Sequence, residues 1–202
     1  MIIVFAKAPV LGQVKTRLVA QLGEWGAARL HERLTLAALR TARDAGCGPV
    51  ELHGTARHSF FSGKASFRLQ RGRDLGERMH RSFSASLRCH RAVVLIGADC
   101  PALRPADLRR AARLLAGACD AVLAPAEDGG YALIALRKVS DVLFENISWG
   151  TPEVYSETLR RLSRLRYRWR ALRTVWDVDR PEDLQRLTAL RYFAARSRPA
   201  RR

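Results

Sequence analysis

The chain has 202 residues, 48% of them hydrophobic, which is enough for one buried core and excludes wholesale disorder. Its formal net charge is +17, from 36 Lys and Arg residues against 19 Asp and Glu residues. No apolar run approaches the roughly 18 residues that a membrane span needs, and the apolar residues 1–6 end at Lys7, too early for a signal peptide. We therefore expect a cytoplasmic protein without a membrane partner.

The basic charge is almost entirely arginine, spread along the chain without interleaved aromatic residues. This distribution argues against a nucleic-acid partner, although a basic nucleic-acid-binding module remains an alternative. The positive field favours anionic ligands such as nucleoside diphosphates in either case. Four scattered cysteines form no CxxC pair, so we expect plain thiols.

Short apolar runs alternate with segments of helical periodicity along the chain. Strands are expected at 1–6, 50–54, 66–70, 92–96, 120–124 and 131–136, and helices at 25–45, 74–87, 105–116, 151–162 and 181–196. This alternation predicts an α/β fold with a mostly parallel sheet covered on both faces, that is, three α/β/α layers. We expect one domain over residues 1–196, followed by a disordered basic tail at 197–202.

The first candidate site is the loop of residues 7–17, which follows the first strand directly. Lys7, Lys15 and Arg17 supply three cations, and Gly12 permits a tight turn. Open α/β sheets bind ligands at the carboxyl ends of their strands, and converging cations suit a diphosphate. The GxxxxGK[ST] spacing of a Walker P-loop is missing. The alternative is a solvated basic loop.

Two further candidates carry aspartates at predicted strand ends. Asp99 follows the apolar run 92–96, where a carboxylate can hold Mg²⁺ or Mn²⁺; the alternative is a cap for the next helix. Asp177 and Asp179 end a predicted strand before the helix that starts at Pro181. Asp179 either caps that helix or completes a metal site with Asp99.

Two glycine-containing turns and one tryptophan complete the candidates. Asp128 lies in the acidic turn 126–130, which is equally typical of plain hairpin chemistry. Residues 70–79 form a glycine-interrupted turn into a helix at another strand end. Trp149 precedes a helix start, where it either stacks on a base or sugar or packs in the core.

Six segments in order, spanning residues 2–184, resemble a bacterial glycosyltransferase family with a GT-A-like, nucleotide-diphospho-sugar transferase fold, the DUF2064 type. They read IIVFAKAPVLGQVKTRL, QRGRDLGERM, VVLIGADCPAL, APAEDGGYALIAL, LFENISWGTPEVYSETL and DVDRPEDL. The family is related in fold to molybdenum-cofactor guanylyltransferases and other nucleotidyltransferases. Some members are associated with arsenosugar biosynthesis or radical-SAM gene neighbourhoods.

The resemblance implies a nucleotide-binding edge and a metal site. The nucleotide-binding residues would be Lys7, Gly12, Lys15, Arg17, Gln70, Asp74 and Gly76. Asp99 stands where GT-A proteins carry a metal-binding aspartate, and Asp179 matches the aspartate of a DxPEDL ending, a second ligand for Mg²⁺ or Mn²⁺. The chain departs from the family pattern at Leu11, where proline is expected, and at Ala98, where serine is usual; neither change removes a charge.

These observations predict a metal-dependent transferase that moves a sugar from a nucleotide-sugar donor to a small-molecule acceptor. Asp128 is the candidate base toward the acceptor hydroxyl. The alternative enzyme is a nucleotidyltransferase that acts on an NTP and a phosphorylated small molecule. The sequence leaves the base, sugar, acceptor and oligomeric state open.

Overall fold

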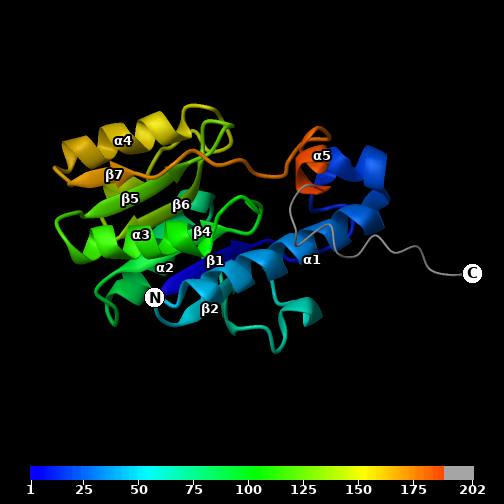
Figure 1. The fold of residues 1–202 in the computed structure, drawn as a ribbon, viewed down its shortest axis with the longest axis horizontal. Helices are drawn as coiled ribbons and strands as arrows, with labels where there is room; N and C mark the ends of the chain where they lie inside the picture. Colours follow the sequence, from blue (N-terminus) through cyan, green and yellow to red (C-terminus); the bar gives the residue numbers. More distant parts are fainter. Residues whose placement is uncertain (189–202) are drawn as a thin grey trace, which may run out of the picture.

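The computed structural model describes residues 1–188, and a seven-stranded sheet forms its centre (Figure 1). In spatial order the strands are β3-β2-β1-β4-β6-β5-β7. Their bounds are β1 Ile2–Ala6, β2 Val50–Gly54, β3 Ser66–Leu69, β4 Val93–Gly97, β5 Ala121–Pro125, β6 Tyr131–Leu136 and β7 Trp169–Ala171. The pairs β1–β2, β1–β4, β2–β3 and β5–β7 are parallel, whereas β6 runs antiparallel to both β4 and β5. The predicted α/β class with a mostly parallel sheet is confirmed.

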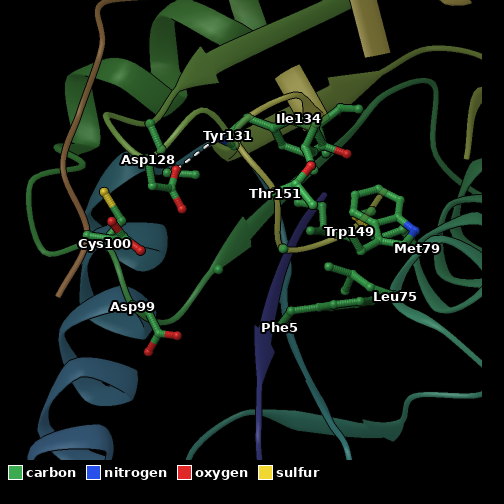
Figure 2. A pocket seen from close by; sticks show the side chains of 18 residues that line it. Phe5, Leu75, Met79, Asp99, Cys100, Asp128, Tyr131, Ile134, Trp149 and Thr151 are labelled. Atoms are coloured by element: carbon green, nitrogen blue, oxygen red, sulfur yellow. Dashed lines mark hydrogen bonds between the residues drawn. The ribbon is translucent and has the colours of Figure 1, made fainter. Parts of the chain in front are cut away.

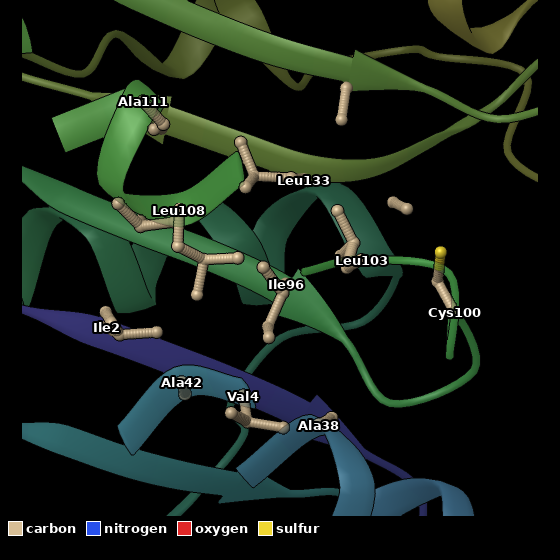
Figure 3. Close-up of a cluster of buried hydrophobic side chains, with 14 of the residues drawn as sticks. Ile2, Val4, Ala38, Ala42, Ile96, Cys100, Leu103, Leu108, Ala111 and Leu133 are labelled. Atoms are coloured by element: carbon tan, nitrogen blue, oxygen red, sulfur yellow. The ribbon is translucent and has the colours of Figure 1, made fainter. Parts of the chain in front are cut away.

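Helices cover both faces of the sheet because its central strands are apolar on both sides. The helices are α1 Val19–Ala45, α2 Leu75–Leu87, α3 Pro105–Ala116, α4 Val154–Arg164 and α5 Asp183–Thr188. On one face, α1 and α3 pack against Ile2 and Val4 of β1 (Figure 3). On the other face, α2 and α4 pack against Ile3 and Phe5. Successive residues of a strand point to opposite faces, so one apolar strand serves both layers.

A third apolar cluster fixes the C-terminal segment beside the start of α1. Leu18, Leu30 and Leu34 pack with Val178 and Leu187, and α5 lies next to the first turns of α1 (Figure 1). The helix α1 is interrupted at Gly23, whose φ of 67° and ψ of 167° are not helical. This cluster brings the segment 177–179 to the loop of residues 7–17.

Several boundaries differ from the sequence prediction. The short strand β7 was not predicted, because its three residues, Trp169 to Ala171, are too few to show the alternation expected of a strand. The strand predicted before Asp177 is wrong: only an isolated bridge from Val175 to Ala126 forms there. The helix predicted from 25 begins at Val19 instead, and the one predicted from 181 begins at Asp183. Residues 189–196 of that helix and the predicted disordered tail at 197–202 lie outside the described residues.

None of the helices found among residues 1–188 combines the length and apolar character that crossing a membrane requires.

Candidate active site

A pocket of about 310 Å³ opens at the edge of the sheet where β1 and β4 end (Figure 2). Because β6 is antiparallel to β4, its amino end and the turn before it reach the same edge. Asp99 and Cys100 lie on one side of the pocket with Asp128, and apolar side chains form the other side. This size lies at the lower end of the range typical of small-molecule sites.

Three carboxylates, from Asp99, Asp128 and Asp177, line the pocket, although they lie far apart in sequence. Backbone hydrogen bonds hold their segments together. The Val178 N–H donates to the Asp99 carbonyl oxygen at 2.9 Å, and the Glu127 N–H donates to the Val175 carbonyl oxygen at 3.0 Å. The segment that carries Asp177 is therefore bonded both to the end of β4 and to the turn that carries Asp128.

These carboxylates affect one another's ionisation. Burial and the negative charge of Asp128 raise the pKa of Asp177 to about 6, with a smaller contribution from Asp99. The raised pKa of Asp177 thus reflects first the burial of its carboxyl group and then the neighbouring charge of Asp128. A cation or a hydrogen-bond donor on a ligand would favour the ionised form of this carboxyl group.

Lys15 forms an ion pair with Asp99. Its Nζ lies 2.8 Å from Asp99 Oδ1 and donates to the Val178 carbonyl oxygen at 2.5 Å, while its side chain is only 4% exposed. Burial alone would raise the pKa of Asp99, but the Lys15 charge and the adjoining His31 ring, 3.5 Å away, lower it overall. The backbone of Lys15 is left-handed, with φ 50°, a conformation that non-glycine residues adopt at a cost.

Arg17 pairs with Asp179 on the outside of the same loop, and both side chains are substantially exposed. Neither capping alternative for the two aspartates is supported. Asp183, rather than Asp179, accepts the backbone N–H groups before α5, from Asp179 at 3.0 Å and Arg180 at 2.8 Å. At α3, the carboxylate that accepts the Arg104 N–H is that of Asp107, not Asp99.

The other residues predicted to bind nucleotide follow β1, follow β3 or lie at the start of α2, and most already have structural roles. Gln70 donates from its side chain to the His53 carbonyl oxygen at 2.7 Å, and the exposed Lys7 accepts at its carbonyl oxygen from His31 Nε2 at 2.9 Å. Gly12 has φ 72°, as its predicted turn requires. Asp74 is the N-cap of α2 and accepts from the Glu77 N–H at 2.8 Å.

Gly76 was predicted at the nucleotide edge, and the structure places it under Trp149. A Cβ at this glycine would lie 2.4 Å from the Phe144 carbonyl oxygen and 3.0 Å from the Trp149 indole. Trp149 in turn meets Tyr131 edge to face, with ring centroids 6.5 Å apart, and lines the pocket. The indole is thus packed against its neighbours and also faces the cavity, while stacking of Trp149 on a base or sugar stays a prediction.

Asp177 was noticed in the sequence but not assigned to the site, and Gly97 and the apolar lining other than Trp149 were missed. Asp177 could have been found from the sequence because it directly precedes Val178, whose apolar side chain had to be buried. The apolar lining carries no such signal, because core residues and pocket residues look alike in a sequence.

The carboxylate oxygens of the pocket are of the type that binds a divalent metal, but they do not surround a metal position by themselves. Within residues 1–188, no three His, Cys, Asp or Glu side chains are grouped closely enough to hold a metal ion by themselves. Mg²⁺ often takes only one or two protein carboxylates and completes its shell with water and phosphate oxygens. A hard, oxygen-seeking cation beside Asp177 would offset both the burial of its carboxylate and the charge of Asp128.

The family model of DUF2064, described as an uncharacterized protein conserved in bacteria, matches residues 30–151. The chain belongs to this family. Its match includes β4 with Asp99 and the turn with Asp128, and ends at the loop after Trp149. No curated protein matches the sequence.

Solved structures share the fold. A Desulfovibrio desulfuricans G20 protein, provisionally described as a nucleotide-diphospho-sugar transferase, has a TM-score of 0.87 and 29% identity, covering 96% of this chain and 91% of its own. A nucleotidyl transferase from Methanothermobacter has a TM-score of 0.59 and 16% identity, with 92% and 95% covered. A Mycobacterium tuberculosis H37Rv protein in complex with manganese has a TM-score of 0.54 and 17% identity, with 92% and 97% covered. The fold is that of the nucleotide-diphospho-sugar transferases.

Proposed function

We propose that the protein is a nucleotide-using transferase and, more specifically, a metal-dependent glycosyltransferase that uses a nucleotide-sugar donor. The observation that carries this proposal is the convergence of Asp99, Asp128 and Asp177 on one pocket beside the basic loop of residues 7–17. Similarity to the Desulfovibrio protein over nearly the whole chain supports the nucleotide sugar as donor.

The metal site proposed here retains Asp99 as a ligand and has Asp177 in place of the predicted second ligand, Asp179. Asp177 lines the same pocket as Asp99, whereas Asp179 is engaged by Arg17. We therefore assign Asp99 and Asp177 as the carboxylates that would hold Mg²⁺ or Mn²⁺, with Asp179 orienting Arg17. When bound, the metal would neutralise the diphosphate leaving group. The manganese complex of a protein with the same fold is compatible with this choice.

The remaining roles follow from exposure and charge. Arg17 is exposed and lies on the loop that reaches the sheet edge, so it would contact the phosphates, together with Lys7. Lys15 would instead hold Asp99 in place, because its ammonium is already bonded to that carboxylate and to Val178. Asp128 accepts the Gly130 N–H at 2.9 Å, which orients its carboxylate as the base toward an acceptor hydroxyl.

The test is a thermal-shift panel of NDPs, NTPs and nucleotide sugars, each with and without Mn²⁺, on the wild type and three variants. A ligand that binds the folded state raises the unfolding midpoint by mass action. Asp99→Asn and Asp177→Asn should lose the Mn²⁺-dependent part of the shift, whereas Asp44→Asn, on the exposed end of α1, should keep it. An Asp99→Asn variant that behaves like the wild type would refute the metal assignment.

Product analysis then separates the two transfer reactions. Release of a nucleoside diphosphate from the stabilising nucleotide sugar supports glycosyl transfer. Release of pyrophosphate from an NTP, with no turnover of nucleotide sugars, would assign the protein to nucleotidyl transfer instead.

A further inference from the structure

Gly97 leaves open space in the pocket wall beside Asp99. It is the last residue of β4, and a Cβ placed on it would have no heavy atom within 4 Å apart from its chain neighbours. Its φ is not among the positive values that favour glycine, so the backbone does not demand this residue. Strand alternation places Gly97 on the same face as Leu95, which also lines the pocket. The absence of a side chain at Gly97 therefore leaves this part of the cavity open.

The pocket wall away from the carboxylates is apolar and partly aromatic. Phe5, Leu75, Met79, Ile134 and Trp149 form it (Figure 2). Leu75, which lies at the start of α2, is 43% exposed and lines this pocket. A polyhydroxylated ligand would place hydroxyls against these side chains without partners, whereas a flat apolar ring would bury surface against them.

Two glycines allow the walls of this pocket to pack closely against each other without a ligand. Gly76 lets the Trp149 indole lie directly on the start of α2. At Gly129 a Cβ would lie 2.2 Å from the Pro152 carbonyl oxygen, and its own carbonyl oxygen accepts the Tyr155 N–H at 2.9 Å. The turn that carries Asp128 is thus pinned to the loop that follows Trp149. A preformed pocket avoids the ordering cost of binding and favours a rigid ligand.

We propose that this pocket binds the acceptor, and that the acceptor is a small hydroxylated compound with a flat, apolar, ring-containing body. The ring would lie between Trp149 and the space at Gly97, with its hydroxyl toward Asp128. This assignment rests on the proposed glycosyl transfer. In that reaction the acceptor oxygen bonds to the anomeric carbon of the sugar, whose bond to the diphosphate oxygen breaks. The hydroxyl proton passes to Asp128, and the bonding electron pair leaves with the nucleoside diphosphate.

The test uses 2-naphthol as a flat hydroxylated probe and myo-inositol as a polyol of small size, in saturation-transfer NMR. We expect 2-naphthol to receive saturation from the wild type and myo-inositol to receive none. Gly97→Leu, which fills the space, and Trp149→Ala, which removes the platform, should each weaken 2-naphthol binding about tenfold or more. Trp25→Ala changes a tryptophan that is 72% exposed on α1, outside this pocket, and should leave the affinity unchanged.

Two measurements separate the outcome of this test from a loss of folding and from a failure of the proposed function. Unfolding midpoints identify a variant that is not folded, and Gly97→Ala then supplies a milder filling with a smaller loss. Binding of the Mn²⁺-nucleoside diphosphate should persist in Gly97→Leu and Trp149→Ala. Equal 2-naphthol affinity in all variants, or loss of the nucleotide alone, would overturn the acceptor assignment. If the wild type binds 2-naphthol but no nucleotide or nucleotide sugar, the proposed function fails while the pocket assignment stands.

Discussion

The ammonium of Lys15 lies 2.8 Å from Asp99 Oδ1 and 2.5 Å from the Val178 carbonyl oxygen, so one buried side chain joins the basic loop, the end of β4 and the C-terminal segment. This position explains why Lys15 accepts a left-handed backbone. It also gives the lysine a positioning role that its place in a basic loop did not suggest.

Replacing Lys15 with methionine should therefore lower the stability of the fold more than it lowers the affinity for phosphate. We expect Lys15→Met to lower the free energy of unfolding by about 1–3 kcal/mol, less than for a fully buried pair because Asp99 is partly exposed. Urea unfolding measures this loss. Lys64→Met is the matched control, because the Lys64 ammonium lies over the Phe60 ring and contacts no carboxylate in this structure's ion pairs among residues 1–188. A selective loss of nucleoside diphosphate over nucleoside affinity, with stability unchanged, would restore Lys15 as a phosphate ligand.

Arg17 should show the opposite behaviour. Its pair with Asp179 is exposed, so Arg17→Ala should change the free energy of unfolding by less than about 1 kcal/mol. Loss of a charge-assisted phosphate contact should cost about 1.5–3 kcal/mol of nucleoside diphosphate binding, with little effect on the nucleoside. Calorimetric titration of both ligands measures the difference, and Arg43→Ala, in the last turn of α1, controls for net charge. Equal losses for the two ligands would argue against a phosphate contact.

Asp177 should make the stability of the metal-free protein depend on pH. Its pKa of about 6 in the folded state exceeds the usual aspartate pKa of 3.8, so the folded state binds this proton more tightly than the unfolded state. The stabilisation from this group is complete below about pH 4 and is lost as the pH rises through 6.

Asp177→Asn removes that dependence. We expect the variant to be more stable than the wild type by about 1–2 kcal/mol near pH 7.5, a value discounted for partial exposure, with the difference shrinking toward pH 4. Urea unfolding across this pH range, without divalent metal, measures it. Asp44→Asn should show no such trend, and a difference that grows toward low pH would contradict the assignment.

The turn that carries Asp128 should tolerate no side chain at Gly129. Its φ of 87° and the 2.2 Å approach to Pro152 predict that Gly129→Ala lowers the free energy of unfolding by about 2–4 kcal/mol. Gly130→Ala is the neighbouring control, because its closest contact is the Asp128 side chain at 3.2 Å. Thermal unfolding of the two variants compares them; similar midpoints would mean that the turn can move away from Pro152.

The sequence by itself determined the layers of this fold and the chemical character of its sheet edge. Apolar runs such as β1 and β4 can be buried only between two helical layers, and turn glycines such as Gly12 follow from local backbone geometry. Asp99 could be identified in advance because the first residues after a buried strand must lie at the sheet edge.

Only the tertiary structure decided which charged groups share that edge and which neutralise one another. Lys15, Arg17 and Asp179 were all expected to meet ligands; in the structure Lys15 pairs with Asp99, and the packing of Val178 and Leu187 against α1 brings Asp179 to Arg17. The same packing places Asp177 in the pocket. Ion pairing acts over a few ångströms between segments about 80 or 160 residues apart, and no local periodicity encodes such distances.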